Sequence, residues 1–311
     1  MADTKLFGRH TPGGIFTIVD RSNFPTGDIW YVDSTNTTAG ADAAGYGRNP
    51  DTPFLTWVYA AETAAAAGDT IFLMPGHTET IGASAAAALT LSLAGARHIG
   101  LGGRTKKPQI LVDAYADTYI SVTGADTVIE NITFLAGHSD IAIGIAVAAD
   151  GVEIRKCDFL QNTTDENFLI CIDDGGANVT DRLLVEDCTF FGYDTSNTHA
   201  ISFGAAQDKC VIRNNIIDGF YETVALGGAG VVTNILIENN YIQNEDTDAD
   251  QCIAVGANST GIVVRNLVGS NVAGAATTNI NCGNKMMMCE NYSVDTVAGD
   301  VQGVLDPVAT T

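Results

Sequence analysis

Positive charge is scarce in this chain. Its 311 residues include 15 Lys and Arg against 37 Asp and Glu, which gives a formal net charge of −22. Proteins that hold nucleic acid by its phosphates need clusters of basic side chains, and only Arg104, Lys106 and Lys107 lie close together in the sequence. We therefore expect no nucleic-acid partner, and the same acidity disfavours an anionic polysaccharide as a substrate.

Long hydrophobic runs are also missing. No stretch of about 18 apolar residues could cross a bilayer. The opening residues, MADTKLFGRHTPGG, lack the charged-then-apolar pattern of a secretory signal. These two absences predict no membrane partner and assembly in the cytoplasm of the cell that makes the protein.

Aromatic residues and metal-binding motifs are equally sparse. Aromatics make up 7% of the chain, and they form no cluster with acids of the kind that lines a polysaccharide groove. The seven cysteines are spread widely, without a C-x-x-C motif or a His/Cys spacing typical of zinc. We expect them to be small apolar core residues, and we expect no cofactor.

What the chain does contain is an internal repeat between residues 127 and 294. Each repeat has two apolar positions two residues apart, the period of a strand with one face inward. The repeats recur every 24 to 31 residues, a spacing typical of a solenoid. They begin at Thr127, Val152, Leu183, Cys210, Ile235, Ile262 and Met286.

A second short strand precedes most of these repeats and often ends at glycine, as in 142–147, 168–173 and 200–204. Two or three short strands per coil, separated by Gly, Asn and Asp turns, predict an all-β, right-handed parallel β-helix of roughly eight to ten coils. No helix-length amphipathic pattern occurs after residue 70, which excludes leucine-rich and ankyrin repeats.

The pattern also predicts how the chain is divided. The helix expected over 54–67 has Thr52 as its cap and Pro53 in its first turn, and it would cover the open edge of the first coil. The predicted units are an N-terminal arm (1–28), a capping strand, loop and helix (29–68), the β-helix (69–294) and a C-terminal tail (295–311).

One column of the repeat alternates in charge. Apolar inward positions flank it, so it faces outward, and alternating signs on neighbouring parallel strands form an ion-pair ladder. We interpret this ladder as structural, because it determines which coil lies on which. It comprises Glu130, Arg155, Glu186, Arg213, Glu238 and Arg265.

A second outward column is apolar apart from Glu153, and it predicts an interface. A loop of the same chain could cover this stripe, but we favour side-by-side packing of β-helices. The predicted interface residues are Val128, Leu184, Val211, Leu236, Val263 and Met287.

Two acidic segments are candidates for chemistry. Asp173 and Asp174 precede a Gly-Gly pair and could form the carboxylate pair of a glycosidase, although acids beside glycine also form ordinary turns. The 244–250 segment resembles the start of a calcium loop but has neither the Gly nor the Glu that an EF-hand requires, so we interpret it as a solvated loop. An irregular Ca²⁺ site remains the alternative there, with Asp246, Asp248 and Asp250 as its candidate ligands.

The start of the predicted β-helix carries a resemblance to a known family. YVDS (31–34), NPDTPFLTW (49–57), an Ala-rich helix and GDTIFLMPGHTETI (68–81) resemble the opening of the pectate-lyase-like superfamily of right-handed β-helix proteins. The repeats are similar, in particular, to uncharacterised β-helix proteins of tailed-phage virions. The resemblance covers roughly residues 29–294 and implies the fold, whereas the superfamily includes lyases, hydrolases, tailspikes and structural proteins.

The resemblance carries over no catalytic residue. Polysaccharide lyases of the superfamily use a carboxylate-bound Ca²⁺ and an Arg or Lys base, but Arg155, Arg213 and Arg265 already belong to the ladder. The leading hypothesis is therefore a non-enzymatic phage virion protein, such as a capsid decoration or cement protein. The resemblance implies a homotrimer in contact with the major capsid protein or another virion protein. The alternative is a carbohydrate-active β-helix, either a tailspike depolymerase or a polysaccharide lyase or hydrolase, and a surface adhesin is a third hypothesis.

Overall fold

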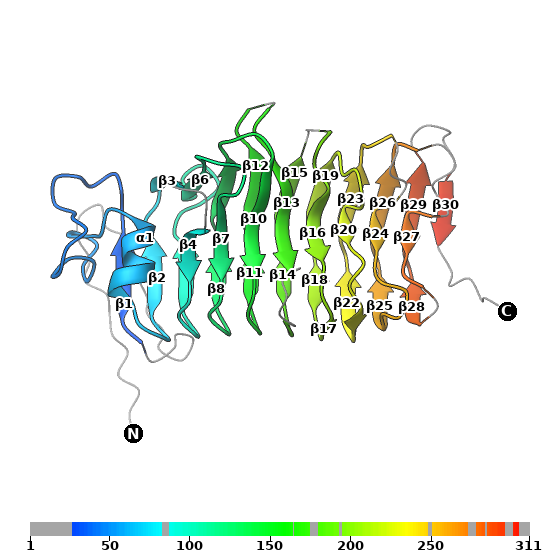
Figure 1. The fold of residues 1–311 in the computed structure, drawn as a ribbon, viewed down its shortest axis with the longest axis horizontal. Coiled ribbons are helices and arrows are strands. Elements are labelled where there is room, and N and C mark those ends of the chain that lie inside the picture. The colour runs from blue at the N-terminus through cyan, green and yellow to red at the C-terminus, as the bar shows by residue number, and fades with distance from the viewer. Residues whose placement is uncertain are drawn as a thin grey trace, which may run out of the picture.

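The computed structural model describes residues 27–82, 87–163, 165–174, 180–192, 195–247, 251–272, 278–283, 285–295 and 301–304. They form an elongated rod of short strands that lie side by side along its length (Figure 1). Each coil of the chain passes through three sheets, called here sheets I, II and III, before the next coil begins. Among the described residues, the strands of successive coils pair in parallel up to β29. The described helical segments are neither long nor apolar enough to cross a membrane.

The strands of sheet I begin each coil. In order along the rod they are β1 (Ile29–Val32), β2 (Thr70–Leu73), β5 (Arg97–Gly100), β8 (Val128–Glu130), β11 (Glu153–Arg155), β14 (Leu184–Glu186), β18 (Val211–Arg213), β22 (Ile235–Glu238), β25 (Gly261–Val264) and β28 (Met286–Cys289).

Sheet II follows after a sharp corner. Its strands are β3 (Thr78–Ile81), β6 (Gln109–Val112), β9 (Thr133–Ala136), β12 (Asp158–Gln161), β15 (Thr189–Gly192), β19 (Ile216–Gly219), β23 (Tyr241–Asn244), β26 (Leu267–Ser270), β29 (Tyr292–Asp295) and β30 (Val301–Val304). β30 lies within the predicted C-terminal tail and pairs with β29 in the antiparallel sense.

Sheet III completes each coil. Its strands are β4 (Ala87–Leu91), β7 (Tyr119–Val122), β10 (Ile141–Val147), β13 (Phe168–Asp174), β16 (His199–Phe203), β20 (Leu226–Gly227), β24 (Ile253–Ala254) and β27 (Ile280–Asn281). Two further strands, β17 (Gln207–Asp208) and β21 (Val232–Thr233), pair with each other where the chain passes from sheet III to sheet I. An 8-stranded sheet with one strand from each complete coil confirms the predicted right-handed parallel β-helix.

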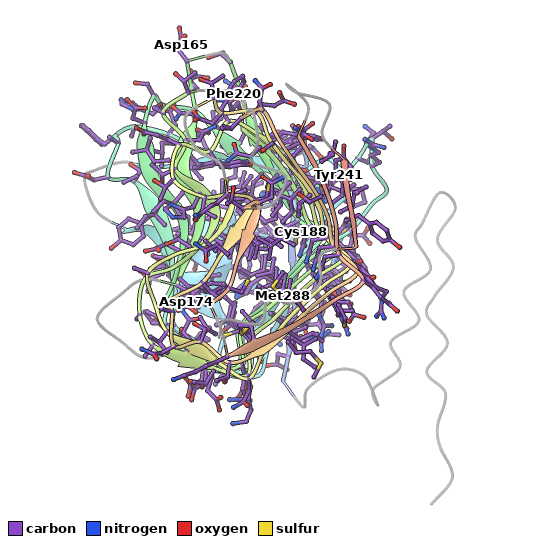
Figure 2. All side chains as sticks on the ribbon, turned by 90° about the vertical axis from the view of Figure 1, so that its right-hand side faces the viewer. Asp165, Asp174, Cys188, Phe220, Tyr241 and Met288 are labelled. Carbon is purple, nitrogen blue, oxygen red and sulfur yellow. The ribbon has the colours of Figure 1, made fainter. Side chains whose placement is uncertain are left out.

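Stacked side chains fill the interior, because equivalent positions of successive coils lie about 4.8 Å apart. Phe134, Phe159 and Phe190 form such a stack, with ring centroids 5.2 and 4.9 Å apart. Cys188 lies inside the rod near this stack (Figure 2), and the Cys157 N–H donates to its sulfur at 3.4 Å. The seven cysteines are unpaired and all but Cys289 are buried, as the sequence predicted.

A ladder of buried asparagines stabilises the corner between sheets I and II in the last coils. Asn240 illustrates the bonding: its side-chain N–H donates to Ile212 O at 3.1 Å and to the Asn266 side-chain oxygen at 2.9 Å. The residue before each asparagine has a left-handed backbone, which turns the chain sharply. The ladder comprises Asn215, Asn240, Asn266 and Asn291, all at most 1% exposed.

The helical cap is shorter than the sequence predicted. It consists of α1 (Trp57–Tyr59) and a π-helical turn, η1 (Ala60–Ala64), at the β1 end of the rod (Figure 1). The predicted start at Thr52 is wrong, because Thr56 is extended and its hydroxyl accepts the Tyr59 N–H at 3.2 Å. The buried Trp57 donates its indole N–H to His98 at 3.0 Å, which fastens the cap to the first coils.

Candidate functional site

The charge ladder follows the predicted register over most of its length. β-pairing places Glu130, Arg155, Glu186, Arg213 and Glu238 on consecutive strands. Arg213 lies 2.7 Å from Glu186, whereas Arg155 lies 3.9 Å from Glu186 and closer, at 2.7 Å, to Glu153 of its own strand.

The last step of the ladder is a correction to the sequence analysis. The strand partner of Glu238 is Val264, not Arg265. Arg265 lies one residue later, at a left-handed corner position with a φ of 56°, and reaches back from there to contact Glu238 and, at 3.9 Å, Glu290. The ion pair therefore forms, although Arg265 does not occupy the strand column.

The same one-residue shift changes the predicted apolar stripe. Val263 pairs with Ile237 and is completely buried, so its assignment to the interface is wrong. The outward residue of that coil is Ile262, which pairs with Leu236 and with Met287. The cause is Gly261, which occupies the first apolar position: a Cβ there would lie 2.1 Å from the Ile235 carbonyl oxygen.

The apolar stripe on sheet I becomes more exposed toward the C-terminal end of the rod. Val128 is only 6% exposed, while Leu184, Val211 and Leu236 are half-buried. Ile262 and Met287 reach 40% and 60% exposure. The final coils therefore present this column to its surroundings, and the earlier coils do so much less.

Sheet II carries a second exposed apolar column that the sequence analysis missed. Strand pairing aligns Ile216 with Tyr241, Tyr241 with Leu267, and Leu267 with Tyr292. These side chains are 46–51% exposed, and Tyr241 points away from the rod in the end-on view (Figure 2). Each lies directly before an inward residue of its repeat, so alternation along the strand was the available signal.

The charge ladder runs between the two columns, since Arg213 and Glu238 each lie between the sheet I and the sheet II member of their coil. We call the two apolar columns together the corner surface. Apart from Tyr115, every large apolar side chain that is strongly exposed among the described residues belongs to it. The corner surface comprises Val211, Leu236, Ile262 and Met287 on sheet I and Ile216, Tyr241, Leu267 and Tyr292 on sheet II.

The candidate acid pair on β13 divides between two faces of the strand. Ile172 and Asp174 are completely buried, and Asp173 between them is half-buried and faces outward. Burial raises the pKa of Asp174 to about 7, even though the Thr180 hydroxyl donates to this carboxylate. Because adjacent strand residues point to opposite faces, the two carboxylates do not face one common groove.

The candidate calcium loop lies partly outside the described residues, since neither Asp248 nor Asp250 is described. Asp246 is 8% exposed, and its backbone N–H donates to the Asn244 side chain at 3.2 Å. Within the part of the chain that the structure describes, no three His, Cys, Asp or Glu side chains are grouped as a metal site. The Ca²⁺ alternative stays a prediction.

A shallow cavity of about 240 Å³ lies over the first strands of sheet II. Glu79 is the acid in its lining, beside Leu111 and Leu135. The Glu79 carboxylate accepts the backbone N–H groups of Trp57 and Val58 at 2.5 and 3.3 Å. This acid therefore holds the helical cap in place.

Comparison with known proteins identifies the fold. No protein-family model matches the chain, and no curated protein matches it in sequence. Among solved structures, a rhamnogalacturonan lyase is similar with a TM-score of 0.59 and 11% identity, over 88% of this chain and 75% of the lyase. Pectate lyase Pel9A is similar with a TM-score of 0.51 and 14% identity, over 91% and 80%. The chain thus shares the right-handed parallel β-helix fold of these two lyases, and identities this low extend to nothing beyond the fold.

Proposed function

We propose that this chain is a non-enzymatic structural protein of a phage virion, a capsid decoration or cement protein that packs as a trimer of β-helices. The observation that carries the proposal is the corner surface. Contiguous exposed apolar patches on monomeric proteins are small, and larger ones mark interaction sites. Each column of the corner surface is continuous over four successive coils, and together the columns combine aromatic with aliphatic side chains, as the centres of protein interfaces do.

Self-association would remove this surface from water. Burying a half-exposed Leu, Ile, Met or Tyr side chain is worth about 1 kcal/mol. Several such side chains from each copy offset the loss of rotational and translational freedom only if they pack closely. We expect size-exclusion chromatography with light scattering to give three times the 32.5 kDa mass of one chain. A monomer at micromolar concentration would overturn the proposed trimer.

The virion assignment is supported by the resemblance of the repeats to β-helix proteins of tailed-phage particles. Its test is the copy number of this chain relative to the major capsid protein in purified particles, by quantitative mass spectrometry. Hundreds of copies per particle are expected for a decoration protein. A handful would place the chain in the tail, and absence from particles would overturn the assignment.

The alternative is a carbohydrate-active β-helix, favoured by the fold shared with two polysaccharide lyases. Incubation with pectin-type and bacterial capsular polysaccharides, followed by chromatography of the products, tests it directly. Cleavage that is lost in Asp173→Asn would support this alternative over the structural proposal. We expect no cleavage of any of these polymers.

A further inference from the structure

The two columns of the corner surface lie at the same height along the rod. Each of the four final coils carries an apolar residue on sheet I and another on sheet II a few residues later. Val211 and Ile216 belong to one coil, and Leu236 and Tyr241 to the next. Ile262 with Leu267 and Met287 with Tyr292 complete the set. The columns are therefore two level strips on either side of one corner.

The corner between the strips is rigid. The asparagine ladder lies directly behind it, and each rung is bonded to the next: Asn266 accepts from the backbone and side chain of Asn240 at 2.9 Å. Asn266 in turn donates to Asn291 at 3.0 Å. A fully satisfied buried network of this kind keeps a surface in one geometry. The two apolar strips thus form the faces of a fixed wedge.

We propose that the sheet I strip of one copy packs against the sheet II strip of a second, parallel copy. This inference rests on the proposed self-association and specifies which faces meet. The contact is heterologous, and rotation about an axis parallel to the rod, without translation, brings level strips together and closes a ring. The coils of both copies are spaced about 4.8 Å apart, so the side chains of facing coils stay aligned along the whole contact.

The charges next to the strips explain why the contact is confined to the final coils. Both columns continue into the earlier coils, where Glu153 occupies the sheet I column and Asp158 the sheet II column of one coil. Each of these acids is ion-paired within its own chain, Glu153 with Arg155 at 2.7 Å and Asp158 with Lys107 at 2.8 Å. Packing a second copy over them would remove both ion pairs from water, which costs free energy that an apolar contact does not, so the apolar coils alone form the interface.

Two single substitutions test the sheet I strip and the sheet II strip one at a time. Leu236→Asp disables the sheet I strip, and Tyr241→Asp disables the sheet II strip of the same coil. The fold accepts acids in both columns, as Glu153 and Asp158 show. Circular dichroism and thermal melting confirm folding, and Gln109→Asp, in the sheet II column but outside the corner surface, is the matched control.

We expect each variant to sediment as a monomer and the control to behave as wild type. An equimolar mixture of the two variants should form a dimer, because each supplies the strip that the other has lost. If Leu236→Asp alone dissociates the oligomer, the contact is between two sheet I strips, and this inference fails while self-association stands. If the mixture stays monomeric, the inference also fails. If the wild-type protein is itself monomeric, the proposed self-association fails with it.

A cross-linking experiment reports the geometry independently of affinity. A photoreactive benzoyl-phenylalanine at position 241 should cross-link to β22 or β25 of a second copy, identified by mass spectrometry of the peptides. Cross-links to β23 or β26 of the second copy would instead show two sheet II strips in contact and would overturn the proposal.

Discussion

The earlier and later coils of the rod share one backbone geometry but place different chemistry on it. In the coils of β11 and β14, the corner interior holds Cys157 and Cys188, and the outward columns include charged and polar residues. In the coils from β18 onward, buried asparagines replace the cysteines, and the two outward columns of the corner surface become apolar, while the charge ladder between them continues. The difference teaches that one backbone geometry accommodates different chemistry inside and outside, because alternation assigns adjacent residues to separate environments.

The largest expected effect comes from breaking this separation within β25. Val263→Asp places a carboxylate in the core, whereas Ile262→Asp places it on the corner surface one residue away. An unpaired buried charge costs several kcal/mol, so we expect Val263→Asp to be unfolded or to lose about 4 kcal/mol. Urea titration, at protein concentrations low enough that wild type and variants are all monomeric, should show a loss of less than about 1 kcal/mol for Ile262→Asp. Equal losses would contradict the assigned register.

The next largest effect is expected at the buried corner position, which is occupied by asparagine in the later coils and by cysteine in the earlier ones. Asn266→Ala leaves the N–H groups of Asn240 without their acceptor, and each such buried donor costs about 1–3 kcal/mol. We expect a loss of about 3 kcal/mol in chemical denaturation. Cys188→Ala, at the matching position of an earlier coil, removes one sulfur atom and with it the weak acceptor of the Cys157 N–H, and should cost about 1–2 kcal/mol. A larger loss for the cysteine would show that the asparagine ladder adds no special stability.

The buried polar groups of these two regions also differ in whether they titrate, so the free energy of unfolding should depend on pH through one of them. The asparagines are neutral and satisfied, whereas one oxygen of the buried Asp174 carboxylate has no hydrogen-bond partner among the residues that the structure describes. Its folded pKa is raised to about 7 from an ordinary 3.8, so the folded state holds the proton more tightly than the unfolded chain. Stability should therefore fall as pH rises from about 4 to 7, by about 2 kcal/mol or more, and then level off.

Asp174→Asn tests this directly, since an amide of the same shape does not titrate. Thermal melts between pH 4 and 8 should show a shallower decline for the variant than for wild type. A parallel pH dependence in the two proteins would assign the effect to other groups.

The smallest effect concerns the charge ladder, which crosses both regions. Arg213→Glu would place three acids in a row with Glu186 and Glu238. Because these side chains are partly exposed to solvent, we expect a loss on the order of 1 kcal/mol in urea titration. Arg213→Gln, which removes the pair without adding repulsion, should lose about half as much. A loss of several kcal/mol would mean that the ladder determines stability as well as register.

Sequence patterns predicted the strand columns where each repeat begins with an apolar residue, and failed where one does not. Gly261 begins its repeat without a side chain, so the pattern started at Ile262 and misassigned Val263 and Arg265. The sheet II column was missed for a different reason. Its members change from Thr133, Asp158 and Thr189 to apolar residues halfway along the rod, so no single character marks the column.

The sequence by itself determined the coiled architecture, because apolar residues two apart at a regular interval have one way to bury themselves together. It also determined the sign order of the ladder and the burial of the cysteines. Only the tertiary structure decided that Asp173 and Asp174 face apart and that two apolar columns lie level on either side of one corner. Those facts depend on the register between strands that are 24 to 31 residues apart in sequence, and hydrogen bonds between coils set that register.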